Sequence, residues 1–237
     1  NSYQESVFVM DSPVVTNSIF NKMLKFGKEE LVIIDCSFST NENALKENIK
    51  RIQGEAEAAV LSGKQHIVLT DKYTDETRVS IPMILATAAV HSFLTRKGIR
   101  SFISLHVQSA ECLDTHYFAV LIGVGATTVN PYLAQECIRE RHEKGLFKDY
   151  TYEECVERYK KAVDQGLLKI MAKLGISVVS AYRGGFNFEV VGLSRSMVNE
   201  YFIGVQSRIS GIGLSGVEYK IKELHKYAYS GDIATLP

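Results

Sequence analysis

The chain has 237 residues, of which 46% are hydrophobic and 23% are charged, as in an ordinary folded globular protein. Its 27 basic residues balance its 27 acidic residues, so no electrostatic footprint for nucleic acid or for an acidic membrane surface is present. No signal peptide opens the chain, and no apolar run approaches the roughly 18 residues of a membrane span. We therefore expect a cytoplasmic protein with neither a nucleic-acid nor a membrane partner.

The four cysteines and six histidines lack the spacings of metal and redox sites. No Cys-x-x-Cys pair is present, so a zinc ribbon, an iron–sulfur site or a thioredoxin motif has no support. The histidines form neither His-x-His nor His-x-x-x-His pairs. Cys36 follows an apolar run and His106 lies within one, so we expect both to be buried in the core. The sequence predicts no metal site and no catalytic residue.

The first half alternates between short apolar runs, which predict strands, and amphipathic segments, which predict helices. Strands are expected at residues 31–35, 66–71, 101–107 and 127–130, and helices at 44–61, 82–95 and 112–123. Asn41 is the expected N-cap of the first of these helices, and Gly63 ends it as a left-handed C-cap. Successive strand–helix units favour a parallel sheet covered by helices.

The expected fold class is α/β, built of parallel (βα) units. Right-handed crossovers leave two arrangements open, a doubly wound sheet or a partial TIM-barrel-like arc. Polar residues end the four strands, at Asp35, Asp71, Gln108 and Asn130. In a barrel, these ends line the face where ligands bind. The alternative is that each one caps the helix that follows it.

The second half changes character after a loop at residues 145–150. We expect one domain over residues 1–237, with a candidate sub-boundary near 145–151. The expected elements are a helix at 152–174, a strand at 176–180, a glycine-kinked turn at 182–186, a helix at 194–202, a glycine-spaced loop at 204–213 and a helix at 215–229. Residues 187–192 fit either a short helix or an extended segment.

Two glycine-containing segments invite an anion-binding interpretation. Gly123-Val124-Gly125-Ala126 follows a helix and precedes a strand, the reverse of a dinucleotide-binding loop, so a helix C-cap and tight turn is favoured. In the glycine-spaced loop, Arg208 with the Ser207 hydroxyl and the amides of Gly211 and Gly213 could hold a phosphate, a carboxylate or a flavin tail. The alternative for Arg208 is an ion pair with a neighbouring domain.

Five stretches, in this order along the chain, resemble the central region of glutamate synthase large subunits. They are Met10-Asp11-Ser12-Pro13-Val14, Thr128-Val129-Asn130-Pro131-Tyr132-Leu133-Ala134, Gly166-Leu167-Leu168-Lys169-Ile170-Met171-Ala172-Lys173-Leu174-Gly175-Ile176-Ser177, Ala181-Tyr182-Arg183-Gly184-Gly185 and Ser207-Arg208-Ile209-Ser210-Gly211-Ile212-Gly213-Leu214. Departures from the family pattern at Ala172, Leu174, Gly185, Phe186 and Asn187 indicate a divergent member. They put in doubt a substrate contact for the turn at residues 182–186.

The resemblance implies that the chain is a structural central segment of glutamate synthase. In that family, a glutamine amidotransferase domain releases ammonia, and an FMN-binding synthase domain adds it to 2-oxoglutarate to yield glutamate. FMN and an iron–sulfur cluster are implied for the parent enzyme, and no cofactor for this segment. The resemblance also implies packing against an FMN-linked oxidoreductase barrel whose α/β topology this segment shares.

Two alternatives stay open beside the structural role. The chain could be a small independent (βα) enzyme that binds flavin or phosphate through Arg208. It could also be a non-catalytic interaction module that self-associates as a homo-oligomer through faces intended for neighbouring domains. The chain begins with Asn1 rather than methionine, so we expect a piece of something longer. The sequence does not distinguish NADH, NADPH and ferredoxin as the electron donor of the parent.

Overall fold

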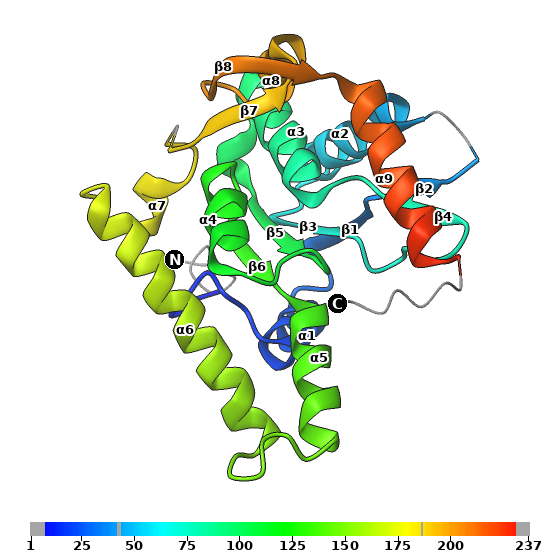
Figure 1. Ribbon diagram of the computed structural model, residues 1–237. Helices are drawn as coiled ribbons and strands as arrows, with labels where there is room; N and C mark the ends of the chain where they lie inside the picture. The colour runs from blue at the N-terminus through cyan, green and yellow to red at the C-terminus, as the bar shows by residue number, and fades with distance from the viewer. Residues whose placement is uncertain (1–7, 42–43, 186, 231–237) are drawn as a thin grey trace.

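The computed structural model describes residues 8–41, 44–185 and 187–230, and Figure 1 shows how their elements are arranged. The strands are β1 (Leu31–Asp35), β2 (Ser37–Ser39), β3 (His66–Thr70), β4 (Arg78–Ser80), β5 (Ser104–Gln108), β6 (Thr128–Asn130), β7 (Glu189–Leu193) and β8 (Gln206–Ile212). The helices are α1 (Asn17–Phe26), α2 (Leu45–Leu61), α3 (Met83–Arg96), α4 (Thr115–Gly123), α5 (Tyr132–Glu143), α6 (Tyr152–Lys173), α7 (Val179–Tyr182), α8 (Arg195–Tyr201) and α9 (Leu214–Ala228). The short 3₁₀ helix η2 (Arg100–Phe102) precedes β5.

A parallel sheet of four strands, in the order β1-β3-β5-β6, forms the centre of the molecule. The order in space equals the order in the chain, so each crossover moves one strand further in the same direction. A doubly wound sheet instead reverses direction at a switch point. The sheet is therefore an open arc of (βα) units. A parallel bridge between Val14 and Val129 extends it beyond β6. The expected α/β class is confirmed.

The two faces of the sheet bury different partners, because side chains alternate along each strand. One set, including Ile67, Leu105 and Val129, joins the main core with apolar residues of α2, α3 and α4. On the opposite face, Val68 packs with Phe20 of α1 in a second, smaller core. None of the helices in the described ranges is both long and apolar enough to span a bilayer.

The second half of the described chain packs around this sheet (Figure 1). α6 contacts α4 and α5, and α8 contacts α3. The Ser92 hydroxyl of α3 donates to the Tyr201 carbonyl of α8 at 2.7 Å. β7 and β8 form a separate two-stranded parallel sheet. Its strands approach so closely that a Cβ on Gly211 would lie 2.1 Å from the Gly192 carbonyl oxygen, so glycine is required at that crossing.

The strand predicted at residues 176–180 is wrong, because this stretch ends in the short helix α7. It follows the left-handed Gly175 directly and connects α6 to the body, so local β-propensity is overridden by its surroundings. The loop predicted at residues 204–213 is also wrong, since residues 206–212 are β8. Gly211 serves close strand packing there. Of the alternatives for residues 187–192, the extended one is confirmed by β7.

The predicted N-cap of α2 is also wrong. Ala44, not Asn41, occupies the cap position, and it supplies no side-chain bond. Instead, the Glu218 carboxylate of α9 accepts the Ala44 and Leu45 backbone N–H groups at 2.9 and 3.2 Å. Glu218 is 8% exposed and pairs with Lys222 at 2.9 Å. An acid at a helix N-terminus satisfies orphan donors and interacts favourably with the helix dipole. The last helix therefore caps an early one.

We predict that Glu218→Ala lowers the free energy of unfolding by about 1–3 kcal/mol, because it leaves two buried N–H groups without an acceptor. Urea denaturation followed by circular dichroism measures the change. Glu223→Ala, an exposed acid on the same helix, is the matched control and should change stability by less than about 0.5 kcal/mol. Equal stability of the two variants would contradict the capping role.

Candidate functional site

A row of polar side chains crosses the face of the sheet that packs against α1, here called the inner face. The row lies near the carboxyl-terminal ends of the strands. Parallel register places Thr70, Gln108 and Asn130 side by side. The Thr70 hydroxyl donates to Gln108 Oε1 at 2.8 Å, and Gln108 Nε2 donates to Asn130 Oδ1 at 3.1 Å. Asn130 Nδ2 then donates to Asn17 Oδ1 of α1 at 2.9 Å. The backbone N–H of Asn17 in turn donates to Gln135 Oε1 of α5 at 2.8 Å. The row thus ties three strands to two helices.

A second polar row lies closer to the amino-terminal ends of the strands. His66 Nδ1 lies 3.0 Å from His106 Nε2, and His106 Nδ1 lies 2.7 Å from the Thr128 hydroxyl. Burial, followed by the charges of His66 and Arg100, lowers the pKa of His106 to about 3. His106 is therefore neutral at ordinary pH, with one ring nitrogen free to donate and the other to accept. The expected buried, hydrogen-bonded His106 is confirmed.

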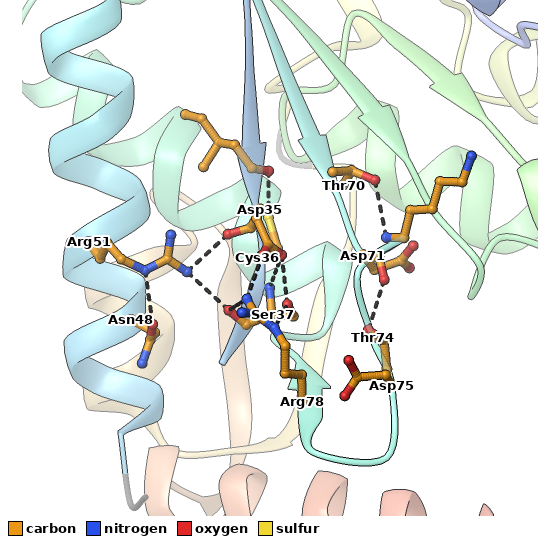
Figure 2. A network of polar contacts seen from close by, with 12 residues as sticks. Asp35, Cys36, Ser37, Asn48, Arg51, Thr70, Asp71, Thr74, Asp75 and Arg78 are labelled. Carbon is orange, nitrogen blue, oxygen red and sulfur yellow. Dashed lines mark hydrogen bonds and ion pairs between the residues drawn. The ribbon is translucent and has the colours of Figure 1, made fainter. Parts of the chain in front are cut away.

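Asp35, at the end of β1, anchors the network shown in Figure 2. Its Oδ1 accepts the backbone N–H and the hydroxyl of Ser37 at 2.8 and 2.7 Å. Arg78 of β4 donates to Oδ2 at 2.5 Å. Arg51 of α2 donates to the carbonyls of Asp35 and Ser37 at 2.9 and 3.2 Å. Cys36 lies buried beside this network, and burial raises the pKa of its thiol, so this core residue keeps its proton at ordinary pH.

Asp71, directly after β3, is the most deeply buried carboxylate at this edge, with 3% exposure. It accepts the Ala110 backbone N–H at 2.8 Å and the Ser109 hydroxyl at 3.2 Å. The Tyr132 hydroxyl of α5 also donates to it. Burial outweighs these hydrogen bonds and raises the pKa of Asp71 from 3.8 to about 6, with the charge of Glu111 adding to the rise. This carboxyl can hold or release a proton near neutral pH.

Glu111, on the loop after β5, connects this edge to α3. Its Oε2 accepts the Met83 backbone N–H at 2.9 Å at the start of α3. The Tyr117 hydroxyl of α4 donates to the same carboxylate. Glu111 therefore caps α3. Pro82, which occupies the N-cap position of α3, supplies no side-chain hydrogen bond. Capping again comes from a residue distant in sequence.

The strand-end residues singled out from the sequence are only partly brought together. Gln108 and Asn130 bond one another, and Asp71 bonds the loop that follows Gln108. Asp35 instead bonds Ser37 of β2 and Arg78 of β4, two strands that pair antiparallel in a sheet of their own. None of these four side chains caps the helix that follows it, so the capping alternative is wrong for them. Their partners lie on neighbouring strands and loops, which makes the edge a set of cross-links between (βα) units.

The four candidate cofactor-binding residues lie together on β8 and at the start of α9. The Arg208 guanidinium is 75% exposed and lies 3.4 Å from the Glu189 carboxylate of β7. The Ser207 hydroxyl donates to the Leu193 carbonyl at 3.4 Å. Gly211 is packed against β7, and Gly213 is the N-cap of α9. A strand replaces the loop that the anion-binding interpretation assumed, and anion binding by these residues stays a prediction. Phe186, of the neighbouring predicted turn, lies outside the described residues.

Sequence reasoning missed several residues that complete the site. Asn17 and Gln135 come from α1 and α5, helices that were not predicted, and Glu111 was not singled out. Thr16 accepts the Ile19 backbone N–H and is an ordinary N-cap, so the cap and the amphipathic pattern after it could have revealed α1. The pairing of Asn17 with Asn130 across 113 residues has no local signal.

Comparison with known proteins identifies the family to which the chain belongs. A family model described as "Glutamate synthase central domain" matches residues 1–194. The chain belongs to the glutamate synthase central-domain family. It is 51% identical to the glutamate synthase [NADPH] large chain of Azospirillum brasilense, over 99% of this chain and 16% of that protein. It is 37% identical to the corresponding large chain of Bacillus subtilis, over 93% of this chain and 14% of that protein.

A ferredoxin-dependent relative is also similar. The ferredoxin-dependent glutamate synthase of Pyropia yezoensis is 36% identical, over 93% of this chain and 15% of that protein. The chain thus spans less than one-fifth of the length of each of these relatives. The expected resemblance to glutamate synthase large subunits is confirmed.

We predict that Asp71 makes this central domain less stable as pH rises from 4 to 7. The folded pKa of Asp71, about 6, exceeds its ordinary 3.8, so the folded state binds the proton more tightly. Its contribution is fully present at low pH and is lost as pH rises through 6. The unfolding free energy of the wild type minus that of Asp71→Asn should fall by on the order of 3 kcal/mol across this range.

Urea denaturation of both proteins at closely spaced pH values measures this difference. Subtracting the Asp71→Asn curve removes the titration of all other carboxylates. Asp114→Asn, at an exposed helix cap, is the matched control for the loss of one carboxylate. A flat difference for Asp71 would show that its carboxyl titrates normally.

Proposed function

We propose that the chain is the structural central segment of a glutamate synthase large subunit. In this role it joins the glutamine amidotransferase domain to the FMN-binding synthase domain of the same polypeptide or complex. The parent reaction converts glutamine, 2-oxoglutarate and reductant into two molecules of glutamate. The observation that carries the proposal is the match over 99% of this chain to 16% of a glutamate synthase large chain, which supports a position within a much longer polypeptide.

Hydrogen bonds within the carboxyl-terminal edge of the sheet favour a structural role for this chain. In a catalytic barrel, this edge presents polar groups to a ligand. Here, Asp35 is bonded to Arg78 and Ser37, and Asp71 to Ser109 and Ala110. A network whose acceptors are bonded to neighbouring loops holds those loops rigidly. Rigid loops suit a spacer that fixes the distance between two other domains.

Exposed apolar side chains on the last third of the chain support packing against other domains. Val191 of β7 and Ile209 of β8 are more than half exposed, as are Tyr219 and Leu224 of α9. Apolar surface of this kind is typical of faces that another domain covers. Self-association of the isolated chain through the same faces, giving a homo-oligomer, stays a prediction that light scattering measures.

FMN and the iron–sulfur cluster are assigned in this proposal to other domains of the parent. The position of Arg208 on a strand and its ion pair with Glu189 support this assignment. The relatives' names include NADPH, NADH and ferredoxin forms, so the donor is left unassigned. A cytoplasmic location is also part of the proposal, whereas the rice relative is named chloroplastic.

A chimera tests the proposal. The matching segment of the Azospirillum brasilense large chain is replaced by this chain, and glutamine-dependent glutamate formation is measured. We predict that the chimera keeps at least about one-tenth of the parent rate, because a spacer acts through its shape and a barrier rise below about 1.4 kcal/mol is expected. A flexible glycine–serine linker of equal length is the control and should abolish the coupled reaction. A folded but inactive chimera would contradict the proposal.

A further inference from the structure

Two arginines meet at the amino-terminal ends of β5 and β6. Arg100 of η2 donates to the Gly125 carbonyl at 2.8 Å and to His91 Nδ1 at 3.0 Å. Arg183, the C-cap of α7, donates to the Thr127 hydroxyl at 3.0 Å. Gly125 and Thr127 lie two residues apart on the turn between α4 and β6. This short turn therefore bonds both guanidinium groups.

No acid neutralises either arginine within the described residues, since neither belongs to any ion pair there. Both side chains are half-buried. Burial, followed by the charge of Arg183, lowers the pKa of Arg100 to about 10. Burial and both arginines lower the pKa of His91 to about 4, so this histidine stays neutral. Partly desolvated charges in proteins are normally paired, so two adjacent cations without an anion call for a partner.

Unused hydrogen-bond donors point the same way. A guanidinium has five N–H donors, and Arg183 uses one of them within the described residues. The Thr127 hydroxyl accepts from Arg183 and from the Leu105 backbone N–H, both at 3.0 Å. Its own O–H finds no acceptor in the described ranges. Arginine and hydroxyl donors are the groups that bind carboxylates and phosphates.

A cavity of about 430 Å³ opens beside this turn, and Thr127 forms part of its wall. Its walls also carry the hydroxyls of Ser101, Ser104 and Thr128. The volume lies within the range of small-molecule sites. Asp11, an exposed acid, also lines the cavity and forms no ion pair with either arginine in the described chain. Neither arginine lines the cavity itself, but Thr127 belongs to its wall and accepts the hydrogen bond from Arg183, so an anionic group at this wall would lie beside the arginines.

We propose that Arg183 and Arg100 form a binding site for the oxyanion of a small molecule, a carboxylate or a phosphate, at the Thr127 wall of this cavity. Arg183 supplies a planar fork of donors, Thr127 a hydroxyl donor, and Arg100 a second positive charge held by backbone carbonyls. The site lies at the opposite end of the strands from the cross-linked carboxyl-terminal edge. It is independent of the linking role proposed above.

Isothermal titration calorimetry of this chain tests the site, with inorganic phosphate and malonate as probes. Ionic strength is held constant with chloride, because salt screens such contacts. We expect saturable binding of at least one probe. Arg183→Gln should weaken it about tenfold or more, the loss expected for charge-assisted hydrogen bonds. Arg141→Gln, at an exposed arginine on α5, is the matched control and should bind as the wild type does.

The two probes separate the two ligand classes. Binding of phosphate alone identifies a phosphate site, binding of malonate alone a carboxylate site, and binding of both a general oxyanion site. If circular dichroism shows that Arg183→Gln does not fold, Arg183→Lys replaces it. That variant keeps the charge, loses the planar fork and should bind more weakly than the wild type. The proposal is overturned if neither probe binds, or if the folded Arg183 variant binds with wild-type affinity.

Discussion

The polar side chains buried on the inner face of the sheet impose the constraint on which the rest of this structure depends. A parallel sheet normally buries apolar side chains on both faces, yet here one face carries the buried Thr70, His106 and Asn130 and the half-buried Gln108. Each buried polar group costs free energy unless it is hydrogen-bonded. The strands therefore hold a register in which these groups meet, and α1 and α5 lie where they complete the row. A one-residue slip would break every bond in it.

The same constraint explains why the carboxyl-terminal edge differs from that of a catalytic barrel. Loops at that edge are usually free to vary and to bind ligands. Here, Arg51 and Arg78 hold the loop after β1, while Asp71 holds the loop after β5. Bonds between these loops make them stiffer and less able to adapt to a ligand. Such stiffness suits the spacer role proposed for this member of the glutamate synthase central-domain family.

Much of this fold could be predicted from local sequence, and the failures share a physical cause. Apolar runs at residues 31–35 and 66–70 form β1 and β3, and Gly63 ends α2 with a left-handed φ of 83°. The predictions that were wrong concerned elements that depend on partners distant in sequence. Residues 206–212 resemble a loop in sequence, and they form a strand because they pair with β7. The candidate site was only partly visible, because strand-end polarity suggested its members but not that Asp71 bonds Ala110.

The contact of Glu218 with the first turn of α2 joins segments that a ribosome makes far apart in time. α2 and the strands beside it emerge early, but the carboxylate that completes its first turn emerges 174 residues after Ala44. Until then, those backbone amides must be solvated. Closure of such a long loop slows folding. The first turn of α2 is therefore capped only after α9 has been synthesised.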